Sequence, residues 1–157
     1  MKNVLISTGG TGGHVIPALN INDHLSNIFN TYIVTDLRGI KFIDKNKYKF
    51  EVIETPKFPS SLTKYPIYFF LIIYSLVKSF LYLKKKKIHY LISTGGYMSI
   101  PLCISAKILG INIYLFEPNK VLGKSNKLIL KFCKKIICNY ENIINFPSKF
   151  DDKIFLI

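Results

Sequence analysis

Cysteine and acidic residues are scarce in this chain of 157 residues. The cysteines Cys103, Cys133 and Cys138 are odd in number and lack CxxC spacing, which excludes a disulfide framework and predicts reduced, buried thiols in a cytosolic compartment. No group of histidines, cysteines or carboxylates has metal-ligand spacing, so we expect neither a metal site nor a cofactor. We also expect no signal peptide, because Met1 and Lys2 lead directly into a strand.

Only 9 acidic residues accompany 22 basic ones, and the formal net charge is +13. Such an excess favours an anionic partner, which is a phosphate-rich ligand, an anionic membrane surface or nucleic acid. Every basic residue except Arg38 is lysine, and Lys, Asn and Ile are frequent throughout, as in AT-rich genomes. The total charge therefore carries little information, and only its clustering matters. No basic stripe interleaved with aromatics lies near the glycine-rich segments, so we expect no nucleic-acid partner.

One pentapeptide, Ile-Ser-Thr-Gly-Gly, occurs twice, at residues 6–10 and 92–96. Each copy follows a short apolar segment that predicts a strand. Glycine allows close approach to the backbone, and the first amides of a following helix point outward at the positive end of its dipole. The repeat therefore predicts two phosphate-facing loops on one side of a sheet, and a diphosphate or a nucleotide as the ligand.

Strand-like and helical segments alternate along the chain, which predicts an α/β fold with a Rossmann-like parallel sheet and helices on both faces. Pro17 fits the first turn of a helix, and Gly110 fits the residue just past a helix end. Both glycine loops and the turn at Glu117 would fall at the carboxyl ends of strands, where open sheets bind ligands. We expect strands at 3–7, 32–35, 50–54, 90–93, 112–116, 135–138 and 153–157, and helices at 17–29, 66–86, 99–109 and 124–132.

Two known phosphate motifs fit poorly. The dinucleotide pattern GxGxxG would need its last glycine at Val15, although Asp36 lies where a ribose-binding acid would follow the second strand. A P-loop would need its first glycine at Pro118. A nucleotide-binding module that acts through Asp36 is therefore kept as a weaker alternative.

Four segments in order resemble the MurG-type peptidoglycan glycosyltransferases. They are STGGTGGHVIPAL at 7–19, TDLRG at 35–39, STGGYMSIP at 93–101 and FEPNKVLGKSNKLI at 116–129. The resemblance implies the N-terminal half of a GT-B glycosyltransferase, with residues 1–157 as a Rossmann-like, membrane-associated acceptor domain and the C-terminal UDP-GlcNAc-binding domain absent. An end on a bare apolar strand likewise suggests a truncated or split protein.

The same resemblance implies the activity and the partners. Members of the family transfer N-acetylglucosamine, with inversion, from UDP-GlcNAc to undecaprenyl-diphospho-N-acetylmuramoyl-pentapeptide, which turns lipid I into lipid II in peptidoglycan synthesis. They work peripherally at the cytoplasmic face of the inner membrane. We expect this activity of the complete protein and expect the present chain to be inactive alone. The alternative is a non-catalytic subunit that recruits a split glycosyltransferase to the membrane.

Site residues follow from the matched motifs. His14 matches the general base of the family, and the dipole at a helix start disfavours imidazolium, so the ring can accept a proton. Glu117 matches a family acid in the same cleft and is the second expected catalytic residue, which would either orient the acceptor or assist proton transfer. Substrate binding is implied for Thr11, Gly12, Gly13 and Asn119 at the UDP-sugar, and for Gly10, Gly95, Gly96 and Tyr97 in the loops that hold the acceptor diphosphate. The chain has Phe116 and Pro118 where the family usually has His and Gln.

Residues 65–83 are apolar and aromatic, and a lysine cluster follows at 84–87. A membrane span needs about 20 apolar residues, but Lys78 interrupts this run and its tyrosines suit an interface. We therefore expect a crossover helix with one face in the core and the other on anionic headgroups. A fully buried helix with a solvated lysine tail is the alternative. The residues expected at the membrane are Tyr68, Phe69, Ile72, Lys78, Lys84, Lys85 and Lys86.

Overall fold

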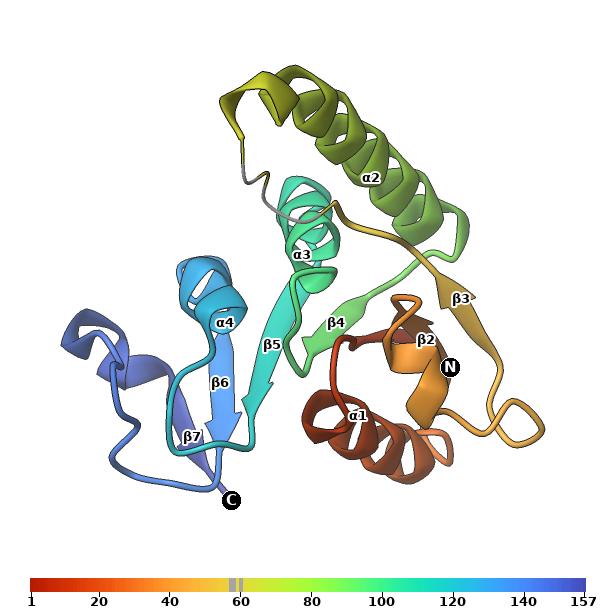
Figure 1. Cartoon of the computed structure of the whole chain (residues 1–157). Coiled ribbons are helices and arrows are strands. Elements are labelled where there is room, and N and C mark those ends of the chain that lie inside the picture. Colours follow the sequence, from red (N-terminus) through yellow and green to blue (C-terminus); the bar gives the residue numbers. More distant parts are fainter. Residues whose placement is uncertain (57–58, 60) are drawn as a thin grey trace.

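The computed structural model describes residues 1–56, 59 and 61–157. In this part of the chain seven strands form one sheet in the order β3-β2-β1-β4-β5-β6-β7, and every neighbouring pair is parallel (Figure 1). The strands are β1 (Asn3–Ser7), β2 (Asn30–Thr35), β3 (Phe50–Val52), β4 (Tyr90–Ser93), β5 (Asn112–Glu117), β6 (Lys135–Cys138) and β7 (Ile154–Leu156). The predicted parallel α/β sheet is confirmed.

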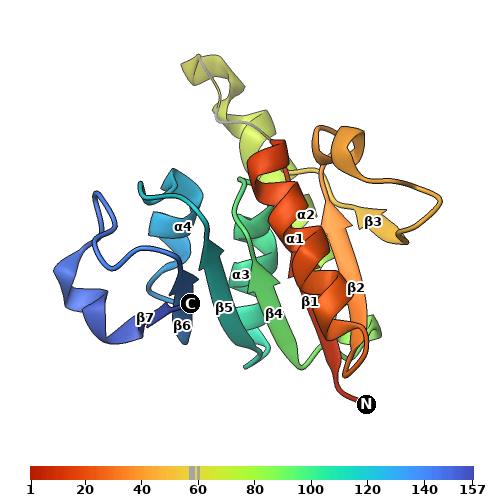
Figure 2. The same ribbon diagram turned by 90° about the horizontal axis from the view of Figure 1, so that it is seen from below.

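Helices cover both faces of the sheet, as predicted. Those of the α type are α1 (Gly12–Leu25), α2 (Tyr65–Lys85), α3 (Ser99–Ile108) and α4 (Lys124–Ile129), and short 3-10 turns are η1 (Gly39–Phe42), η2 (Leu62–Lys64) and η3 (Ser148–Lys153). Figure 2 shows α1 in front of the sheet and α2, α3 and α4 behind it. The chain is therefore doubly wound around β1.

The central strands are continuous apolar runs because both faces of the sheet are buried. Neighbouring residues of a strand point to opposite faces, so Leu5 packs into the core beneath α2, α3 and α4, whereas Ile6 packs with Ala18 of α1. All three side chains are inaccessible to solvent. A parallel sheet that is buried on both faces needs apolar residues at successive positions, and each large side chain contributes about 1.5–3 kcal/mol on burial.

The strand order reverses at β1. The chain leaves β1 through α1 to β2 on one side, and it returns from β3 through α2 to β4 on the other side of β1. In open parallel sheets such a reversal leaves a crevice at the carboxyl ends of the two central strands, where ligands bind. The two copies of the repeated pentapeptide end β1 and β4, so both loops lie at this crevice.

Helix boundaries differ from the prediction most at both ends of α1, which ends at Leu25 rather than at residue 29, and at the end of α4. α1 begins at Gly12, and Pro17 therefore lies inside the helix rather than in its first turn. Pro17 lacks the N–H that would donate to the preceding turn, yet the burial of Val15 and Leu19 against β2 and Ile43 holds the helix together across it. α4 ends at Ile129 rather than at residue 132. Gly110 follows α3 with a φ of +70°, which confirms its predicted place past a helix end.

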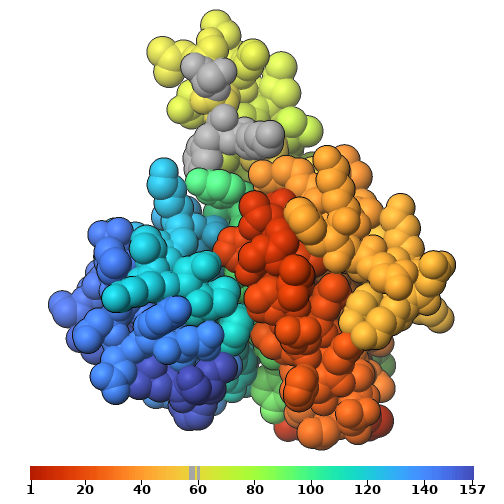
Figure 3. Space-filling model, turned by 60° about the horizontal axis from the view of Figure 1, so that its bottom comes forward, coloured from red at the N-terminus to blue at the C-terminus, as the bar shows by residue number. Residues whose placement is uncertain are grey.

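α2 changes character along its length. From its middle onward it packs on α3, and Ser75, Ser79 and Leu83 are buried there. Its first turns project beyond the body of the molecule, as Figures 1 and 3 show. The helical segment Leu62–Lys85 is long and apolar enough to cross a membrane by length and composition. It nevertheless connects two parallel strands of the same sheet, so here it is the crossover helix that the sequence predicts.

The three cysteines of the chain are free thiols and are buried, as predicted. Burial raises the pKa of the Cys103 thiol far above its usual range and raises that of Cys133 to about 11. Since the thiolate is the reactive form, these cysteines are packing residues.

Candidate functional site

The two copies of the pentapeptide lie side by side at the crevice. Ile6 pairs with Ile92 and Ser7 with Ser93 along β1 and β4. The amide of Thr94 then donates to the carbonyl of Ser7 (3.1 Å), which extends the ladder to the start of both loops. We call residues 8–13 the first loop and residues 94–98 the second loop. The prediction that both loops fall on one rim of the sheet is confirmed.

The glycines let the two loops interlock. A Cβ atom on Gly96 would lie 2.8 Å from the carbonyl oxygen of Gly9, and one on Gly95 would lie 2.8 Å from Cε1 of His14. Both residues also have positive φ angles, +111° for Gly95 and +90° for Gly96, which side chains disfavour. The second loop therefore requires glycine because the backbone of the first loop and the His14 ring rest directly on it.

His14 is the third residue of α1 and joins the two loops. Its ring is half-buried against Gly95. Its Nδ1 atom is buried, and the described residues offer it no hydrogen-bond partner. A buried, unpaired ring nitrogen is rare in a protein without a functional reason. The structure therefore places an imidazole ring with an unpartnered nitrogen at the rim of the crevice, directly against the second loop.

Three of the six glycines in the two loops have amides that donate to a side chain. Gly10 N–H donates to Asp36 Oδ1 (2.9 Å), Gly95 N–H to Ser93 Oγ (3.3 Å) and Gly96 N–H to Ser125 Oγ (3.2 Å). Within the described residues, no hydrogen bond engages the amides of Gly12 and Gly13 at the start of α1. These two amides, at the positive end of a helix, are the donors that the loops present to an anion.

Glu117 is fully buried at the end of β5 and organises the loop that follows. Its Oε1 accepts hydrogen bonds from the backbone and side-chain amides of Asn119 (3.2 and 3.0 Å). Its Oε2 accepts from Gly123 N–H and from Asn126 Nδ2 (both 2.9 Å). With both oxygens doubly occupied, the carboxylate acts as a brace that positions the exposed Asn119 at the carboxyl end of β5, the strand next to β4.

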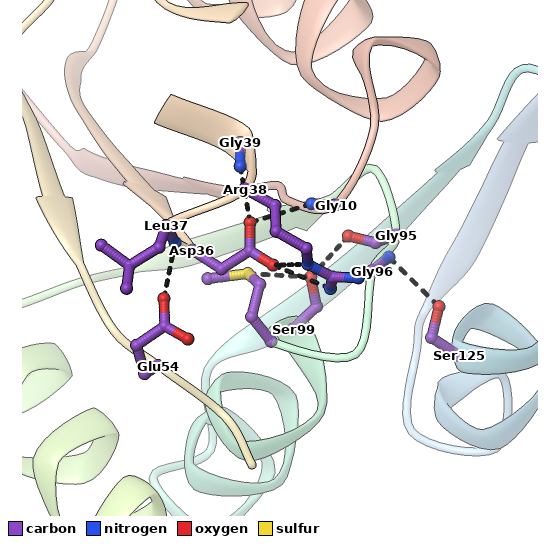
Figure 4. Close-up of polar contacts among 11 residues, drawn as sticks. Gly10, Asp36, Leu37, Arg38, Gly39, Glu54, Gly95, Gly96, Ser99 and Ser125 are labelled. Atoms are coloured by element: carbon purple, nitrogen blue, oxygen red, sulfur yellow. Dashed lines mark hydrogen bonds and ion pairs between the residues drawn. The ribbon is translucent and has the colours of Figure 1, made fainter. Parts of the chain in front are cut away.

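Asp36 braces the first loop in the same way, as Figure 4 shows. Its Oδ1 accepts from Gly10 N–H and Gly39 N–H (2.8 Å), and its Oδ2 accepts from Nε and Nη2 of Arg38 (3.1 and 2.9 Å). Burial would raise the pKa of Asp36, but these hydrogen bonds and the guanidinium charge outweigh burial and lower it. The saturated carboxylate has no acceptor to spare for a ribose hydroxyl, which disfavours the alternative of a nucleotide module acting through Asp36.

The remaining expected site residues are placed as follows. Thr11 and Gly13 are exposed on the first loop, and Tyr97 is exposed on the second. No group of three or more His, Cys, Asp or Glu that could hold a metal ion occurs in the described part of the chain. The sequence analysis missed the roles of Ser125 and Asn126, although both lie in the last of the four motifs. The sequence also predicted Asp36 only as a candidate ribose-binding acid, and not as the residue that braces the first loop.

The residues expected at a membrane lie on α2 and just after it. Phe69, Lys78, Lys84 and Lys85 are exposed, whereas Tyr68, Ile72 and Lys86 are half-buried. Further large apolar side chains are exposed in the first turns, among them Ile67 (65% exposed), Phe70 (71%) and Tyr74 (65%). The exposed apolar side chains thus gather in the first turns, whereas the buried residues of α2 lie from its middle onward.

Comparison with known proteins assigns the chain to a family. The glycosyltransferase family 28 N-terminal domain matches residues 4–138. A Pelagibacter ubique protein named UDP-N-acetylglucosamine--N-acetylmuramyl-(pentapeptide) pyrophosphoryl-undecaprenol N-acetylglucosamine transferase is 48% identical over 156 residues, which are 99% of this chain and 44% of that protein. This chain therefore belongs to glycosyltransferase family 28 and corresponds to the N-terminal domain of its MurG-type members.

Solved structures share the fold. The crystal structure of MurG from Acinetobacter baumannii matches with a TM-score of 0.82 at 23% identity, over 99% of this chain and 45% of that chain. UDP-GlcNAc 2-epimerase from Neisseria meningitidis bound to UDP-GlcNAc matches with a TM-score of 0.71 at 14% identity, over 98% and 45%. At these identities the likeness shows the fold alone. The chain spans less than half the length of the curated relatives that it matches.

Proposed function

We propose that this chain is the acceptor-side domain of an inverting N-acetylglucosaminyltransferase that converts lipid I into lipid II. One observation carries the proposal: the interlocked loops place His14 of α1 on the second glycine loop, at the crevice of the sheet. The relative that is 48% identical is named for this transfer to a pyrophosphoryl-undecaprenol acceptor. The partners would be UDP-GlcNAc, the undecaprenyl-diphosphate-linked muramoyl-pentapeptide and an anionic membrane surface.

The chemistry would be a direct displacement. His14 removes the proton from a hydroxyl of the acceptor sugar while the hydroxyl oxygen forms a bond to the anomeric carbon of N-acetylglucosamine. The bond from that carbon to the UDP oxygen breaks, UDP leaves with the electron pair, and the configuration inverts. The open amides of Gly12 and Gly13 stabilise phosphate charge without reorganisation. The substrate-binding set is Thr11, Gly12, Gly13 and Asn119 for the UDP-sugar, with Gly10, Gly95, Gly96 and Tyr97 on the acceptor side.

Glu117 would act by positioning a neighbouring side chain rather than by transferring a proton. As a catalytic acid it would first have to release the four hydrogen bonds that hold it in place. Those bonds instead support a role in orienting Asn119 toward the substrate. The rest of the site, including the domain that binds UDP-GlcNAc, would come from the part of the relatives that this chain does not match. We therefore propose that the chain alone is inactive.

A chimera tests the proposal. This chain is joined to the unmatched part of the Pelagibacter ubique relative, and transfer from UDP-GlcNAc to a lipid-linked acceptor is measured. We expect transfer, and we expect His14→Ala to lower kcat by about 10²–10⁴-fold with little change in donor KM. His24→Ala is the matched control, because His24 is exposed at the far end of α1. Near-normal turnover of the His14→Ala chimera would refute the base assignment.

Peripheral membrane association is proposed for α2. Its exposed first turns carry apolar and aromatic side chains, and Lys84 and Lys85 lie exposed at its end. Interfacial helices combine these two features. In co-sedimentation with vesicles that contain phosphatidylglycerol, Phe69→Ser with Phe70→Ser should reduce binding by about tenfold or more, because each phenylalanine would leave an apolar environment. Ile28→Ser is the control, since Ile28 is equally exposed outside α2.

The second candidate function is a non-catalytic subunit that brings a separate donor domain to the membrane. The exposed apolar turns of α2 favour this second function, because they would bind a membrane whether or not the domain takes part in catalysis. The chimera distinguishes the two functions. A chimera that binds vesicles but transfers no sugar, with His14 intact, would support recruitment and exclude catalysis by this half.

A further inference from the structure

Arg38, the single arginine of the sequence, lies against the first glycine loop. Its Nη2 atom is 3.7 Å from the position that a Cβ atom on Gly10 would occupy. Figure 4 shows the guanidinium extending from the turn after β2 toward both glycine loops. A cation therefore stands at the rim of the crevice, beside the loops that the proposed function assigns to diphosphate.

The guanidinium has donors to spare. Asp36 engages Nε and Nη2, and in the described part of the chain no acceptor contacts Nη1. The Arg38 side chain is 50% exposed, whereas that of Asp36 is 6% exposed. The positive member of this ion pair therefore faces solvent and the negative member faces the interior. Arginine presents five N–H donors in a fixed fork, which matches phosphate oxygens better than an ammonium group does.

Asp36 holds both the first glycine loop and the Arg38 guanidinium in place. It takes up the amide of Gly10 with Oδ1 and holds the guanidinium with Oδ2. The first loop thereby loses one backbone donor to the interior, while the Arg38 fork is held above the same glycine. The first loop therefore exchanges one neutral amide donor for the guanidinium N–H groups that Asp36 does not engage.

We propose that Arg38 is a further binding residue of this site, which contacts the diphosphate group of the ligand, and that Asp36 is its positioning residue. The inference rests on the proposed function, because it requires a diphosphate at the glycine loops. A diphosphate occurs both in a nucleotide donor and in a polyprenyl-linked acceptor. Arg38 recognises the chemistry that the two share.

The test measures binding of soluble diphosphates to the 157-residue chain by calorimetry. The probes are UDP and geranyl diphosphate, which stand for the two sources. Arg38→Gln should weaken binding of at least one probe by about tenfold, the effect of losing one charge-assisted contact. Arg38→Lys should fall between wild type and Arg38→Gln, since it keeps the charge but loses the fork. Lys41→Gln is the control, because it removes the same charge from the exposed surface of η1 three residues further on.

Each outcome decides one question. A loss confined to geranyl diphosphate supports contact with the acceptor, a loss confined to UDP supports contact with the donor, and a loss of both supports the shared contact. Equal effects of Arg38→Gln and Lys41→Gln would overturn the assignment of Arg38 and leave the glycine loops as the binding site. If the folded wild-type chain binds neither diphosphate, the proposed use of the loops fails, and the role of Arg38 fails with it.

Asp36→Asn tests the positioning role separately. The substituted amide can still accept from Gly10 and Gly39 but no longer holds Arg38 as an ion pair. We expect it to weaken diphosphate binding in the wild-type background and to have little further effect when Arg38 is already Gln. Additive effects of the two substitutions would contradict action through Arg38.

Discussion

The two glycine loops begin with the same three residues, Thr-Gly-Gly, but use their glycines differently. In the first loop the chain runs on into α1, which leaves the amides of Gly12 and Gly13 open in the described structure and presents His14. In the second loop the amides of Gly95 and Gly96 are bound by serine hydroxyls, and these glycines accommodate the His14 ring and the backbone of the first loop.

Glycine therefore has two different roles in these loops, to expose backbone amides and to allow close approach of neighbouring groups. A glycine-rich turn after a strand is usually associated with phosphate because of its accessible amides. That explanation holds here for Gly12 and Gly13 of the first loop, whereas Gly9 of the first loop and both glycines of the second loop are needed for close approach. The first loop thus offers the proposed chemistry, and the second is the platform on which His14 rests. Substitutions that affect one use and spare the other can test this division.

Gly95→Ala should have the largest effect on stability. The new Cβ would lie 2.8 Å from the His14 ring at a backbone φ of +111°. Strain of this kind destabilises a fold by about 1–3 kcal/mol, and the displaced His14 should also reduce transfer in the chimera. Unfolding can be followed by circular dichroism in urea, since the sequence contains no tryptophan for fluorescence.

The control for this substitution comes from the other loop. A Cβ on Gly13 would make an ordinary contact, 3.7 Å from Thr11 Oγ1. Gly13→Ala should therefore leave the free energy of unfolding unchanged or raise it by about 0.4–1 kcal/mol through the unfolded state. If both substitutions destabilise the chain equally, the second loop has no special steric role.

Asp36→Asn should have the next largest effect, and that effect should depend on pH. The pKa of Asp36 is lower in the folded chain than in the unfolded chain. Its carboxylate therefore contributes stability above the unfolded pKa of about 4, and the contribution is lost as the pH falls through the lower folded value. At neutral pH the substitution should lower the free energy of unfolding by about 2 kcal/mol, typical of hydrogen bonds to a charged group. The difference from wild type should narrow below about pH 4. A gap that stays constant into acid would show that the charge of Asp36 is not what braces the first loop.

The sequence predicted the frame of the site because the frame depends on local pattern. The strands Asn3–Ser7, Tyr90–Ser93 and Lys135–Cys138 were placed to the residue, and the rim that gathers both loops follows from their parallel arrangement. The start of α1 was misplaced because proline is favoured at the first position of helices. Here the burial of Val15 and Ala18 on the sheet extends the helix past Pro17.

The internal contacts of the site could not be predicted in this way. Asp36 reaches Gly10 across 26 residues, and Ser125 reaches Gly96 across 29 residues. Pairing at such separations depends on how the strands are ordered, which the local pattern does not contain. For the same reason the pattern of α2 could not show which of its turns would lie beyond the sheet.

Ser125→Ala should have the smallest effect on stability, and it tests how the second glycine loop is held. It removes the hydroxyl that accepts from Gly96 N–H at 3.2 Å. A lost neutral hydrogen bond lowers the free energy of unfolding by about 1 kcal/mol, and the better helix propensity of alanine offsets a few tenths of that. Lys124→Ala, at the exposed neighbouring position of α4, controls for helix propensity. Because a serine hydroxyl does not titrate, the loss of stability in Ser125→Ala should stay constant over the pH range in which that of Asp36→Asn narrows.

Hydrogen exchange tests whether the two loops are braced independently. Faster exchange at the Gly96 amide in Ser125→Ala, with the Gly10 amide unchanged, would show that they are. Loss of protection at both amides would instead mean that the loops open as one unit.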